Sequence, residues 1–508
     1  MVRRFAKGVA AAGLAALLVQ AAGISAGAPD TAPRTTEPVW AEEVARGLNY
    51  PSAFAFLPDG DILITERQGG LRRVHGGRLM AAPLTGLPPS FQTLLNGYKD
   101  IALDPQYRTN HLVWLLLSEG TFERHWPAVW RARYDNGRLV EARRIYRPAE
   151  DMTGTAPDGG RMAFLPDGTL LVGVPCSSQT GCGLDTVQGK VIRLTREGTA
   201  PRDNPFIAQD KVAPEVWTWG HRVQNGLFVD PVDRAVWEAE PGPRGGDELN
   251  LLEPGADYGW PRASWGFAYS GNVVAPRQFG EGITDPWLTW MPAMTPSAVM
   301  RYHGRVYPGW DGDLFVTGLT GRAVERLRFV GKELAQRERL LVGLKERFRD
   351  VRQGPDGYLY ALTDHGNGRL VRLVPGRPGA GAHPAKALDI VAQDLPGDKF
   401  APGDPVAGRA AFQSHCAACH SLGTEIAGGD VGPNLAGVYL AKAGSRPGFA
   451  YTTAMRGSHQ TWDIPTLIVY MQNPAGVVPG TAMAMPPLED SQARRDIATF
   501  LTRAAASH

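Results

Sequence analysis

Alternating apolar and polar positions recur along the first three quarters of the chain, and each alternating run follows a turn-forming phrase. The phrase reads FLPDGDILITE at residue 56, FLPDGTLLVGV at 164 and QGPDGYLYALT at 353, with looser relatives in ALDPQYRTNHLVWLLL and FVDPVDRAVWEAE. A strand, a Pro-Asp-Gly turn and a second strand make a β-hairpin. Hairpins repeated at blade-like intervals over residues 38–374, without a convincing amphipathic helix among them, predict an all-β, six-bladed β-propeller. A β-sandwich is the alternative, but it seldom needs so many hairpins in one domain.

The last hundred residues follow a helical pattern. Asp404 followed by Pro405 is a good helix start, because Asp caps the first turn and Pro is favoured within it. The final stretch has three apolar residues at helical spacing, Ile497, Phe500 and Leu501. They predict a terminal helix that packs on the first one. We therefore expect a second, small all-α domain over residues 401–505.

Composition agrees with this division and says little for nucleic acid as a partner. Gly and Pro number 61 and 41, while charged residues make up 20% of the chain, a turn-rich balance expected of an all-β protein. The formal net charge is +2, and removing residues 1–28, which hold three basic and no acidic residues, leaves −1. Residues 375–400 begin rich in Gly, Pro and Ala and are predicted to be a linker.

The first residues predict export. Arg3, Arg4 and Lys7 precede the apolar run GVAAAGLAALLVQAAG, and small residues follow up to Ala28. This order is typical of a secretory signal peptide over residues 1–28, with a retained membrane anchor as the alternative. We expect a periplasmic protein without a stable membrane span after cleavage.

The stretch QSHCAACHSLG carries the most specific chemistry. Cys416 and Cys419, at this spacing on a helix, project from one face, and His420 can turn its imidazole toward whatever the sulfurs hold. This is the attachment pattern of haem c, in which the two thiols bind the porphyrin and the histidine becomes an axial iron ligand. A disulfide or half of a zinc site is the alternative, but zinc needs a second ligand pair. The other two cysteines, Cys176 and Cys182, lie far upstream and, in an exported protein, are expected to form a disulfide.

Residues 400–505 resemble class I cytochrome c beyond this motif. The segments VGPNLAG (431–437) and NPAGVVPGTAM (473–483) are similar to that family's haem-wrapping loops. The resemblance implies Met483 as the second axial ligand, with Met485 as a competitor. Ligation by His and Met raises the reduction potential and closes the sixth coordination site, so the domain is expected to transfer electrons and not to bind oxygen.

Three phrases of the propeller region resemble the glucose/sorbosone dehydrogenase family of soluble quinoproteins. They are TWGHRVQNG (218–226), PGPRGGDELNLLEPGADYGWP (241–261) and ERFRDVRQGPDGYLYALTD (346–364). The resemblance covers most of residues 38–374. It implies pyrroloquinoline quinone (PQQ) in the propeller mouth, calcium beside it, and oxidation of a sugar at its anomeric or aldehyde carbon.

The resemblance also implies which residues bind PQQ. PQQ is a planar tricarboxylate with an ortho-quinone, so its site needs cations, preferably guanidinium groups that pair with carboxylates in bidentate fashion. The family's arginine positions correspond to Arg222, Arg347 and Arg349. For any one of them taken alone, a surface ion pair is the alternative.

Calcium positions follow from the same resemblance. The backbone carbonyls of Gly242 and Pro243 correspond to those that hold calcium beside the quinone, where the ion acts as a Lewis acid. Glu248 and Tyr258 match a second calcium position that some members have.

The segment PDGGR at residues 157–161 departs from the family. The family's histidine base stands four residues before the arginine of this phrase, and here that position is Pro157. Three further family residues are replaced: an Asp by Cys176, a quinone-binding Lys by Thr320 and a Gln by Leu95. The catalytic base is therefore unknown from the sequence.

Replacements for the base can be named from chemistry alone. Asp158 neighbours the missing histidine, and a buried carboxylate with a raised pKa can serve as a general base. His221 and His125 are the other candidates, although a histidine at position 221 fits a hydrogen-bonded structural role equally well.

The predicted function is a periplasmic quinohaemoprotein oxidoreductase. It would oxidise an aldose or related sugar at PQQ and pass electrons through haem c to an external acceptor such as another cytochrome or an oxidase. Tethering a one-electron haem to the propeller raises its effective concentration near the quinone. Two alternatives remain: a propeller without PQQ that acts as a binding or docking module for the cytochrome, and a pocket that oxidises a different small molecule with other residues.

Overall fold

The computed structural model describes residues 39–376 and 403–503. Within these ranges the residues left out are 94, 154–158, 177–181, 267–273, 276–279, 292, 459, 473, 479–480, 484–487 and 489. The predicted signal peptide and most of the linker lie outside the described residues, as do Pro157, Asp158 and Met485.

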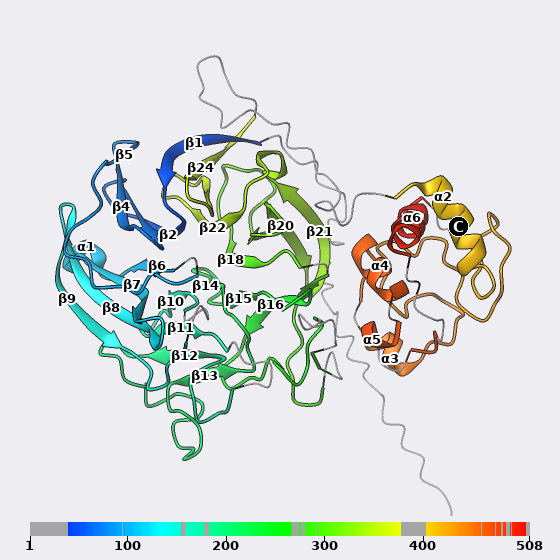
Figure 1. Ribbon diagram of the computed structural model, residues 1–508, viewed down its shortest axis with the longest axis horizontal. Helices are drawn as coiled ribbons and strands as arrows, with labels where there is room; N and C mark the ends of the chain where they lie inside the picture. The colour runs from blue at the N-terminus through cyan, green and yellow to red at the C-terminus, as the bar shows by residue number, and fades with distance from the viewer. Residues whose placement is uncertain are drawn as a thin grey trace, which may run out of the picture. The chain divides into compact units, whose positions relative to one another are not determined.

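Residues 39–376 form six four-stranded antiparallel sheets round a common centre, which confirms the predicted six-bladed propeller (Figure 1). We number the sheets as blades 1 to 6. The strands, from the innermost outward, are β2 (Pro51–Phe56), β3 (Ile62–Glu66), β4 (Gly70–His75) and β5 (Arg78–Leu79) in blade 1; β6 (Tyr98–Leu103), β7 (Leu112–Gly120), β8 (His125–Asp135) and β9 (Arg138–Tyr146) in blade 2; β10 (Met162–Phe164), β11 (Leu170–Val174), β12 (Lys190–Leu194) and β13 (Val216–Trp219) in blade 3; β14 (Gly226–Val229), β15 (Val236–Glu240), β16 (Asp247–Leu252) and β17 (Leu288–Trp290) in blade 4; β18 (Pro296–Arg301), β19 (Leu314–Gly318), β20 (Ala323–Val330) and β21 (Glu333–Leu340) in blade 5; and β22 (Phe348–Gln353), β23 (Leu359–Thr363), β24 (Gly368–Pro375) and β1 (Val39–Leu48) in blade 6. Two short helices, α1 (Tyr107–Asn110) and the 3-10 helix η1 (Val342–Leu344), connect strands.

The first strand of the chain closes the ring. β1 pairs antiparallel with β24, from Val39 opposite Pro375 to Leu48 opposite Gly368, so blade 6 contains both ends of the propeller. The innermost strands β2, β6, β10, β14, β18 and β22 each contact the next one round the ring. Closure removes the exposed sheet edge that an open arrangement of blades would leave.

The recurring sequence phrase is the innermost hairpin of a blade. In blade 1 the amide of Leu57 donates to the carbonyl of Asp61 at 2.7 Å, and Gly60 adopts a φ of 93°. Gly168 and Gly357 repeat this left-handed conformation at φ 84° and 83° in blades 3 and 6. Only glycine adopts it without strain, which explains why the Pro-Asp-Gly turn recurs.

The hydrophobic core is divided into clusters that lie between neighbouring blades. Strand β7 shows how, because its side chains alternate between two faces. Val113, Leu115 and Leu117 belong to a cluster with blade 1, while Trp114 and Leu116 belong to one with blade 3. Both faces of the strand are therefore buried, and its sequence is a continuous apolar run.

Arg161 connects blades at the centre of the ring. It immediately precedes β10 in blade 3 and is only 5% exposed. Its guanidinium donates to the carbonyls of Asn225, Ser297 and Arg349, each at 2.9 Å, which belong to blades 4, 5 and 6. One side chain thus bonds the inner strands of three other blades.

Two aspartates and a second arginine complete this central cluster. Arg161 lies 3.4 Å from Asp100 and 3.6 Å from Asp350, in blades 2 and 6. Arg352 donates to the same two carboxylates at 2.8 and 2.9 Å. Asp100 also accepts the amide of Met162 at 2.8 Å, in the next blade. Two cations and two anions balance, so the cluster carries no net charge.

Residues 403–503 form a helical domain with α2 (Pro405–His415), α3 (Thr453–Arg456), α4 (Ile464–Gln472), α5 (Pro474–Val477) and α6 (Ser491–Leu501). The Asp404 side chain caps α2 by accepting the amide of Val406, as the sequence predicts. The predicted packing of α2 on α6 is also present: Phe412 and Phe500 make an edge-to-face contact with ring centres 5.9 Å apart. A Cβ on Gly408 would lie 2.0 Å from the carbonyl oxygen of Asp496, so only glycine permits this close approach.

Among the residues described, none of the helices has both the length and the apolar character that crossing a membrane requires.

We predict that Arg161→Met lowers the free energy of unfolding of the propeller by about 3–5 kcal/mol, because it leaves buried carbonyls and carboxylates without their partner. Chemical unfolding followed by tryptophan fluorescence measures this. Arg133→Met, which removes an exposed ion pair with Glu141, serves as the control and should change little. A loss below about 1 kcal/mol for Arg161→Met would show that the central cluster does not hold the blades together.

Candidate functional site

Strand direction gathers the candidate residues of the propeller on one face. In every blade the innermost strand begins, and the antiparallel second strand ends, on the same face. Arg222 precedes β14, and Arg347 and Arg349 stand at the start of β22. Cys176 follows β11, and Gly242 follows β15. We call the centre of this face, where the innermost strands begin, the mouth.

Three arginines surround one carboxylate at the mouth. Asp364, which is 5% exposed, forms ion pairs with Arg67 and with Arg347, the latter at 3.3 Å. Arg349 lies near the same carboxylate. Burial, followed by the nearby charge of Arg67, lowers the pKa of Arg349 to about 9, with Asp364 opposing and Arg161 adding to the effect. Positive charge therefore exceeds negative charge here, and an anion would relieve the excess.

Polar atoms at the mouth lack hydrogen-bond partners among the residues that the structure describes. They include the Nε atoms of Arg67 and Arg349 and both amide atoms of Gln224, whose side chain is fully buried. An unpaired buried polar group is costly, so such groups mark a site where a polar ligand fits.

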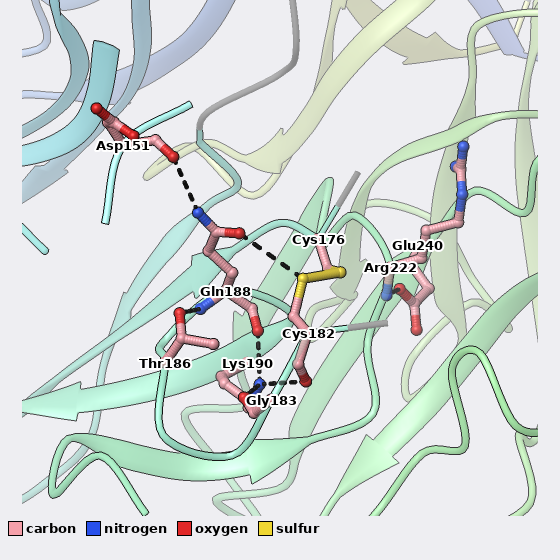
Figure 2. The surroundings of a disulfide bond; sticks show 9 residues. All are labelled: Asp151, Cys176, Cys182, Gly183, Thr186, Gln188, Lys190, Arg222 and Glu240. Carbon is pink, nitrogen blue, oxygen red and sulfur yellow. Dashed lines mark hydrogen bonds between the residues drawn. A yellow bond between two sulfur atoms is a disulfide. The ribbon is translucent and has the colours of Figure 1, made fainter. Parts of the chain in front are cut away.

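Arg222 is fixed from several sides. Its amide donates to Glu240 at 2.6 Å, as Figure 2 shows, and its guanidinium donates to the carbonyl of Pro241 at 3.0 Å. The guanidinium also stacks on Trp260, 5.4 Å from the ring centre. A side chain held in this way loses less conformational freedom when it binds an anion.

Cys176 and Cys182 form a disulfide in the structure (Figure 2). The amide of Cys176 donates to the carbonyl of Arg222 at 2.8 Å, so one half of the disulfide is hydrogen-bonded to the backbone of a candidate quinone ligand. The family's aspartate position thus holds a group that cannot accept a proton.

Lys190 fixes the segment that follows the disulfide. Its ammonium donates to the carbonyls of Cys182, Gly183 and Gln188 at 3.3, 2.8 and 2.6 Å (Figure 2). Burial lowers the pKa of Lys190 to about 8, although Asp185 and Glu150 act in the opposite direction. A cavity of about 320 Å³ beside this segment is lined by the two cysteines and by Trp219, His221, Trp260 and Arg262, among others.

The turn that contains Gly242 and Pro243 offers two carbonyl oxygens. Within the part of the chain that the structure describes, neither carbonyl accepts a hydrogen bond. Asp247 holds the turn by accepting the amide of Gly242 at 2.8 Å and those of Met294 and Thr295 at 2.7 Å each. A rigid turn with two free oxygens suits a calcium ion.

A second group of possible metal ligands comes from β15, from β16 and from the segment between β13 and β14. Suitable atoms of His221, Glu238 and Glu240 all lie within 4.8 Å of one another. Asn250 donates to Glu238 at 3.1 Å and to Glu248 at 3.3 Å. One oxygen of Glu238 and one of Asn250 have no partner among the described residues. Burial, and then the neighbouring Glu240, raise the pKa values of Glu238 and Glu248.

Of the two residues expected at a second calcium site, only Glu248 has its side chain in this group. The phenol of Tyr258 instead donates to the carbonyl of Leu251 at 2.8 Å and accepts the amide of Glu253 at 2.9 Å. The Tyr258 ring stacks on His221 with ring centres 4.8 Å apart. Tyr258 therefore supports the cluster through His221.

The candidate bases differ in their surroundings. His221 is buried, with one ring nitrogen 2.9 Å from the hydroxyl of Thr218 and the other 3.4 Å from Glu240, so both nitrogens are engaged. His125 is buried and packs against Phe91 in a tilted arrangement, with ring centres 5.1 Å apart. Asp158 lies outside the described residues. The structure therefore assigns no base.

At two positions where the family has a polar ligand, 95 and 320, the side chain is not available to bind a quinone. Leu95 is 50% exposed, and the hydroxyl of Thr320 is engaged 2.8 Å from that of Thr295.

In the helical domain, the expectation that the two cysteines of CAACH stand on a helix is wrong. α2 ends at His415, and Cys416 to His420 form a tight turn in which the amides of Cys419 and His420 donate to the carbonyl of Cys416 at 3.1 and 2.9 Å. Neither cysteine forms a disulfide with a described residue, so the turn brings two cysteine side chains and an imidazole together without a helix.

The surroundings of this turn fit a metal-bound histidine. Nδ1 of His420 donates to the carbonyl of Pro433 at 2.8 Å, which leaves Nε2 as the ligand atom. A Cβ on Gly432 would lie 2.2 Å from the imidazole ring, so glycine is needed there. Met483 is partly buried against the core of the domain. Its backbone amide donates a hydrogen bond to the hydroxyl of Thr481 at 3.2 Å, which helps to position the residue.

Sequence reasoning missed Arg67, Asp364 and Gln224. A positional rule would have found the first two, because each directly follows the second strand of its blade, where chain segments meet at the mouth. Gln224 stands two residues after Arg222, in a phrase already singled out.

We predict that Arg349→Met leaves the thermal unfolding midpoint of the cofactor-free chain unchanged or raises it, because the variant removes a poorly compensated cation. Arg352→Met, on the same strand but in the balanced central cluster, should lower the midpoint. Thermal unfolding measures both. Equal destabilisation by the two variants would show that Arg349 is as well compensated as Arg352.

We also predict that calcium stabilises the propeller, by about 2.7 kcal/mol at a hundredfold excess over its Kd, and more strongly at pH 8 than at pH 5. The raised pKa values of Glu238 and Glu248 mean that the metal-free fold loses stability as pH rises above the ordinary carboxyl range, because ionisation there is costly. Calcium offsets this cost. Thermal unfolding with calcium or a chelator measures the effect.

In the same measurement, Glu238→Gln should reduce the calcium effect, whereas Glu253→Gln, an exposed residue of the same blade, should not. A calcium effect that is equal at both pH values and in both variants would exclude the buried carboxylates as the site.

The sequence matches two families. Residues 48–372 match the family described as Glucose / Sorbosone dehydrogenase, and residues 405–504 match Cytochrome c. The soluble aldose sugar dehydrogenase from Escherichia coli, solved in the apo-form, is similar with 35% identity and a TM-score of 0.64, over 66% of this chain and 100% of that one. A PQQ-bound form of aldose sugar dehydrogenase from Streptomyces coelicolor is similar with 27% identity and a TM-score of 0.53, over 66% and 97% of the two chains. Cytochrome c2 from Rhodomicrobium vannielii is 47% identical over 102 residues, which are 20% of this chain and 80% of that protein.

These matches agree with the two folds. The chain belongs to the glucose/sorbosone dehydrogenase family and carries a cytochrome c domain, so it is a sugar oxidoreductase with an electron-transfer domain.

Proposed function

We propose that this chain is a periplasmic quinohaemoprotein that oxidises an aldose or related sugar at PQQ and passes the electrons through haem c to an external acceptor. The signal-peptide pattern of residues 1–28 supports export, which haem c attachment also requires. The acceptor is expected to be another cytochrome or an oxidase.

The observation that carries the proposal is the uncompensated positive charge at the mouth. Arg67, Arg347 and Arg349 share the single carboxylate of Asp364, and the Nε atoms of Arg67 and Arg349 have no partner among the described residues. PQQ carries three carboxylates, so its charge and its acceptors match this deficit. A related protein, the aldose sugar dehydrogenase from Streptomyces coelicolor, has been solved in a PQQ-bound form.

The chain's own residues would hold and orient the cofactor. Arg347 and Arg349 would bind its carboxylates from blade 6, and Arg222, held by Trp260 and Pro241, would do so from blade 4. Gln224 offers one donor and one acceptor. When bound, PQQ supplies an ortho-quinone that accepts two electrons from the sugar. Calcium on the carbonyls of Gly242 and Pro243 would supply a Lewis acid beside it.

Proton removal from the sugar is left to a residue that the described part of the chain does not identify. His221 is engaged at both nitrogens, and the disulfide replaces the family's aspartate. The base therefore stays unassigned, with Asp158, His221 and His125 as the candidates.

The cytochrome c domain supports haem as the second cofactor. Cys416 and Cys419 would bind it, with His420 and Met483 as axial ligands, and haem supplies a one-electron carrier for a two-electron donor. The linker keeps this carrier near the propeller, which raises its effective concentration.

The full chain, loaded with PQQ and calcium under anaerobic conditions, should reduce its own haem when an aldose from a panel is added. The reduced-haem absorption band measures this directly. Arg222→Met should slow the reduction by about a hundredfold or more, since a desolvated charge pair to the cofactor is lost.

Arg244→Met, an exposed arginine of the loop between β15 and β16 in the same blade, is the control and should reduce haem at the wild-type rate. Mass spectrometry of the extracted cofactor shows whether the chain contains PQQ. If it does and the haem stays oxidised with every aldose, the proposed sugar dehydrogenase activity is wrong. A chain that takes up no PQQ would favour the docking-module alternative.

A further inference from the structure

The cavity of about 320 Å³ beside the disulfide belongs to neither of the two proposed cofactors. It lies on the mouth face of blade 3 and is lined by the ends of several strands. Cys176 follows the second strand, Gly189 precedes the third, and Trp219 ends the outermost strand, β13. The cavity therefore extends outward from the mouth, over the strands of blade 3.

The inner end of the cavity adjoins the place where the reaction is proposed. Cys176 stands at the position of the family's aspartate, and its amide donates to the carbonyl of Arg222 at 2.8 Å. Trp260 also lines the cavity, and the Arg222 guanidinium lies over its ring, 5.4 Å from the ring centre. A candidate quinone ligand thus contacts two residues of the cavity wall. A molecule in the cavity would lie next to one bound at the mouth.

Two tryptophan rings form part of the wall. Trp219 and Trp260 both line the cavity and are partly exposed. Trp219 belongs to none of the hydrophobic clusters formed by the described residues, so packing of the core does not explain a large aromatic residue there. Arg262 lines the same cavity and lies over the Trp219 ring, 5.1 Å from its centre. The wall therefore combines flat apolar surface with N–H donors.

The backbone holds the two rings in place. The amide of Trp219 donates to the carbonyl of Ala256 at 3.1 Å, and the amide of Tyr258 donates to the carbonyl of Trp219 at 2.9 Å. The amide of Trp260 donates to the carbonyl of Gly220 at 2.8 Å. The two segments that carry the rings are thus hydrogen-bonded to each other, so little conformational freedom is lost when a ligand binds.

The charged groups around the cavity are paired within the protein. Arg262 forms an ion pair with Asp257, which also accepts the amide of Gly259 at 3.0 Å. Lys190, beside Cys182, donates to three backbone carbonyls (Figure 2). Because these cations already have partners, an anion would gain little from them. The cavity suits a neutral, polar molecule with an apolar face.

A sugar unit has this chemistry. It is uncharged, its ring presents C–H groups on its faces, and its hydroxyls accept hydrogen bonds from guanidinium groups. Small-molecule sites combine aromatic walls with a few polar groups and occupy about 300–1,000 Å³, so a cavity of about 320 Å³ has room for one such unit. A sugar that is oxidised at its anomeric carbon must place that carbon at the mouth. Any further unit of the same sugar then points outward.

We propose that this cavity is the subsite for the second sugar unit of a reducing oligosaccharide, with Trp219 as a specificity-determining residue. The inference rests on the proposed function, because it extends the substrate from an aldose to an oligosaccharide that is oxidised at its reducing end. The reducing unit lies at the mouth, and the second unit packs against Trp219 and Trp260 over blade 3.

Isothermal titration of the full chain, prepared with haem and without PQQ, measures sugar binding without turnover. The probes are maltose, cellobiose and lactose, with glucose and galactose as their single units. At least one disaccharide should bind about tenfold more tightly than either monosaccharide. Trp219→Leu should remove this difference, because it removes the stacking surface.

Trp287→Leu is the control, at another partly exposed tryptophan that has a cation over its ring but lies in blade 4 on the face opposite the mouth. It should keep the wild-type preference for the disaccharide. Leu184→Trp fills the cavity from another part of its wall and should remove the preference as Trp219→Leu does, which provides a second test if Trp219→Leu does not fold. Disaccharides that bind the wild type no more tightly than monosaccharides, or that bind both cavity variants as well as the wild type, would show that the cavity is not a subsite.

Haem reduction in the PQQ-loaded chain separates this inference from the proposed function. If disaccharide binding depends on Trp219 but every sugar leaves the haem oxidised, the sugar site is present and the proposed oxidation is wrong. If monosaccharides and disaccharides reduce the haem equally well and Trp219→Leu changes neither rate, the oxidation is correct and the subsite is wrong.

Discussion

The neutral cluster of Asp100, Arg161, Asp350 and Arg352 is the constraint on which the propeller and its site both depend. It bonds the innermost strands of several blades to one another at the centre of the ring. Buried charges are tolerated in such a place only when they are paired and hydrogen-bonded. Because this cluster already uses both of its aspartates, they are not available to the other cations at the mouth.

Some charged side chains at the mouth are paired within the central cluster and others are not, and both kinds occur on the same strand. In β22 the side chains of Asp350 and Arg352 belong to the balanced cluster, while Arg349 lies in the bulge next to them. Arg349 contributes its carbonyl to the fold, through Arg161, and leaves its guanidinium without full compensation. A candidate ligand-binding group is thereby positioned by its backbone, and its side chain stays available.

The sequence predicts the architecture well because the information is local. Each Pro-Asp-Gly turn and its alternating strands identify the inner hairpin of a blade, and the CAACH motif identifies the second domain, although it occupies a turn and not the expected helix. The site is less predictable, because its contacts join residues far apart in the chain. Arg67 pairs with Asp364, 297 positions away, and no local pattern records that pairing.

The departures from the family are distributed unevenly over the mouth, and this bears on the chemistry. Arg222, Gly242, Arg347 and Arg349, which the resemblance assigns to the quinone and its calcium, lie in blades 4 and 6. Leu95, Pro157 and Cys176 replace residues in or before blades 2 and 3, where the family has its base and the residues around it. Most of the residues that would hold the cofactor are therefore kept, although Thr320 in blade 5 stands in place of the family's quinone-binding lysine. The side of the mouth that would face the sugar departs further and carries a disulfide. Such a pattern is expected when the electron acceptor is unchanged and the proton acceptor, together with the fit of the substrate, is not.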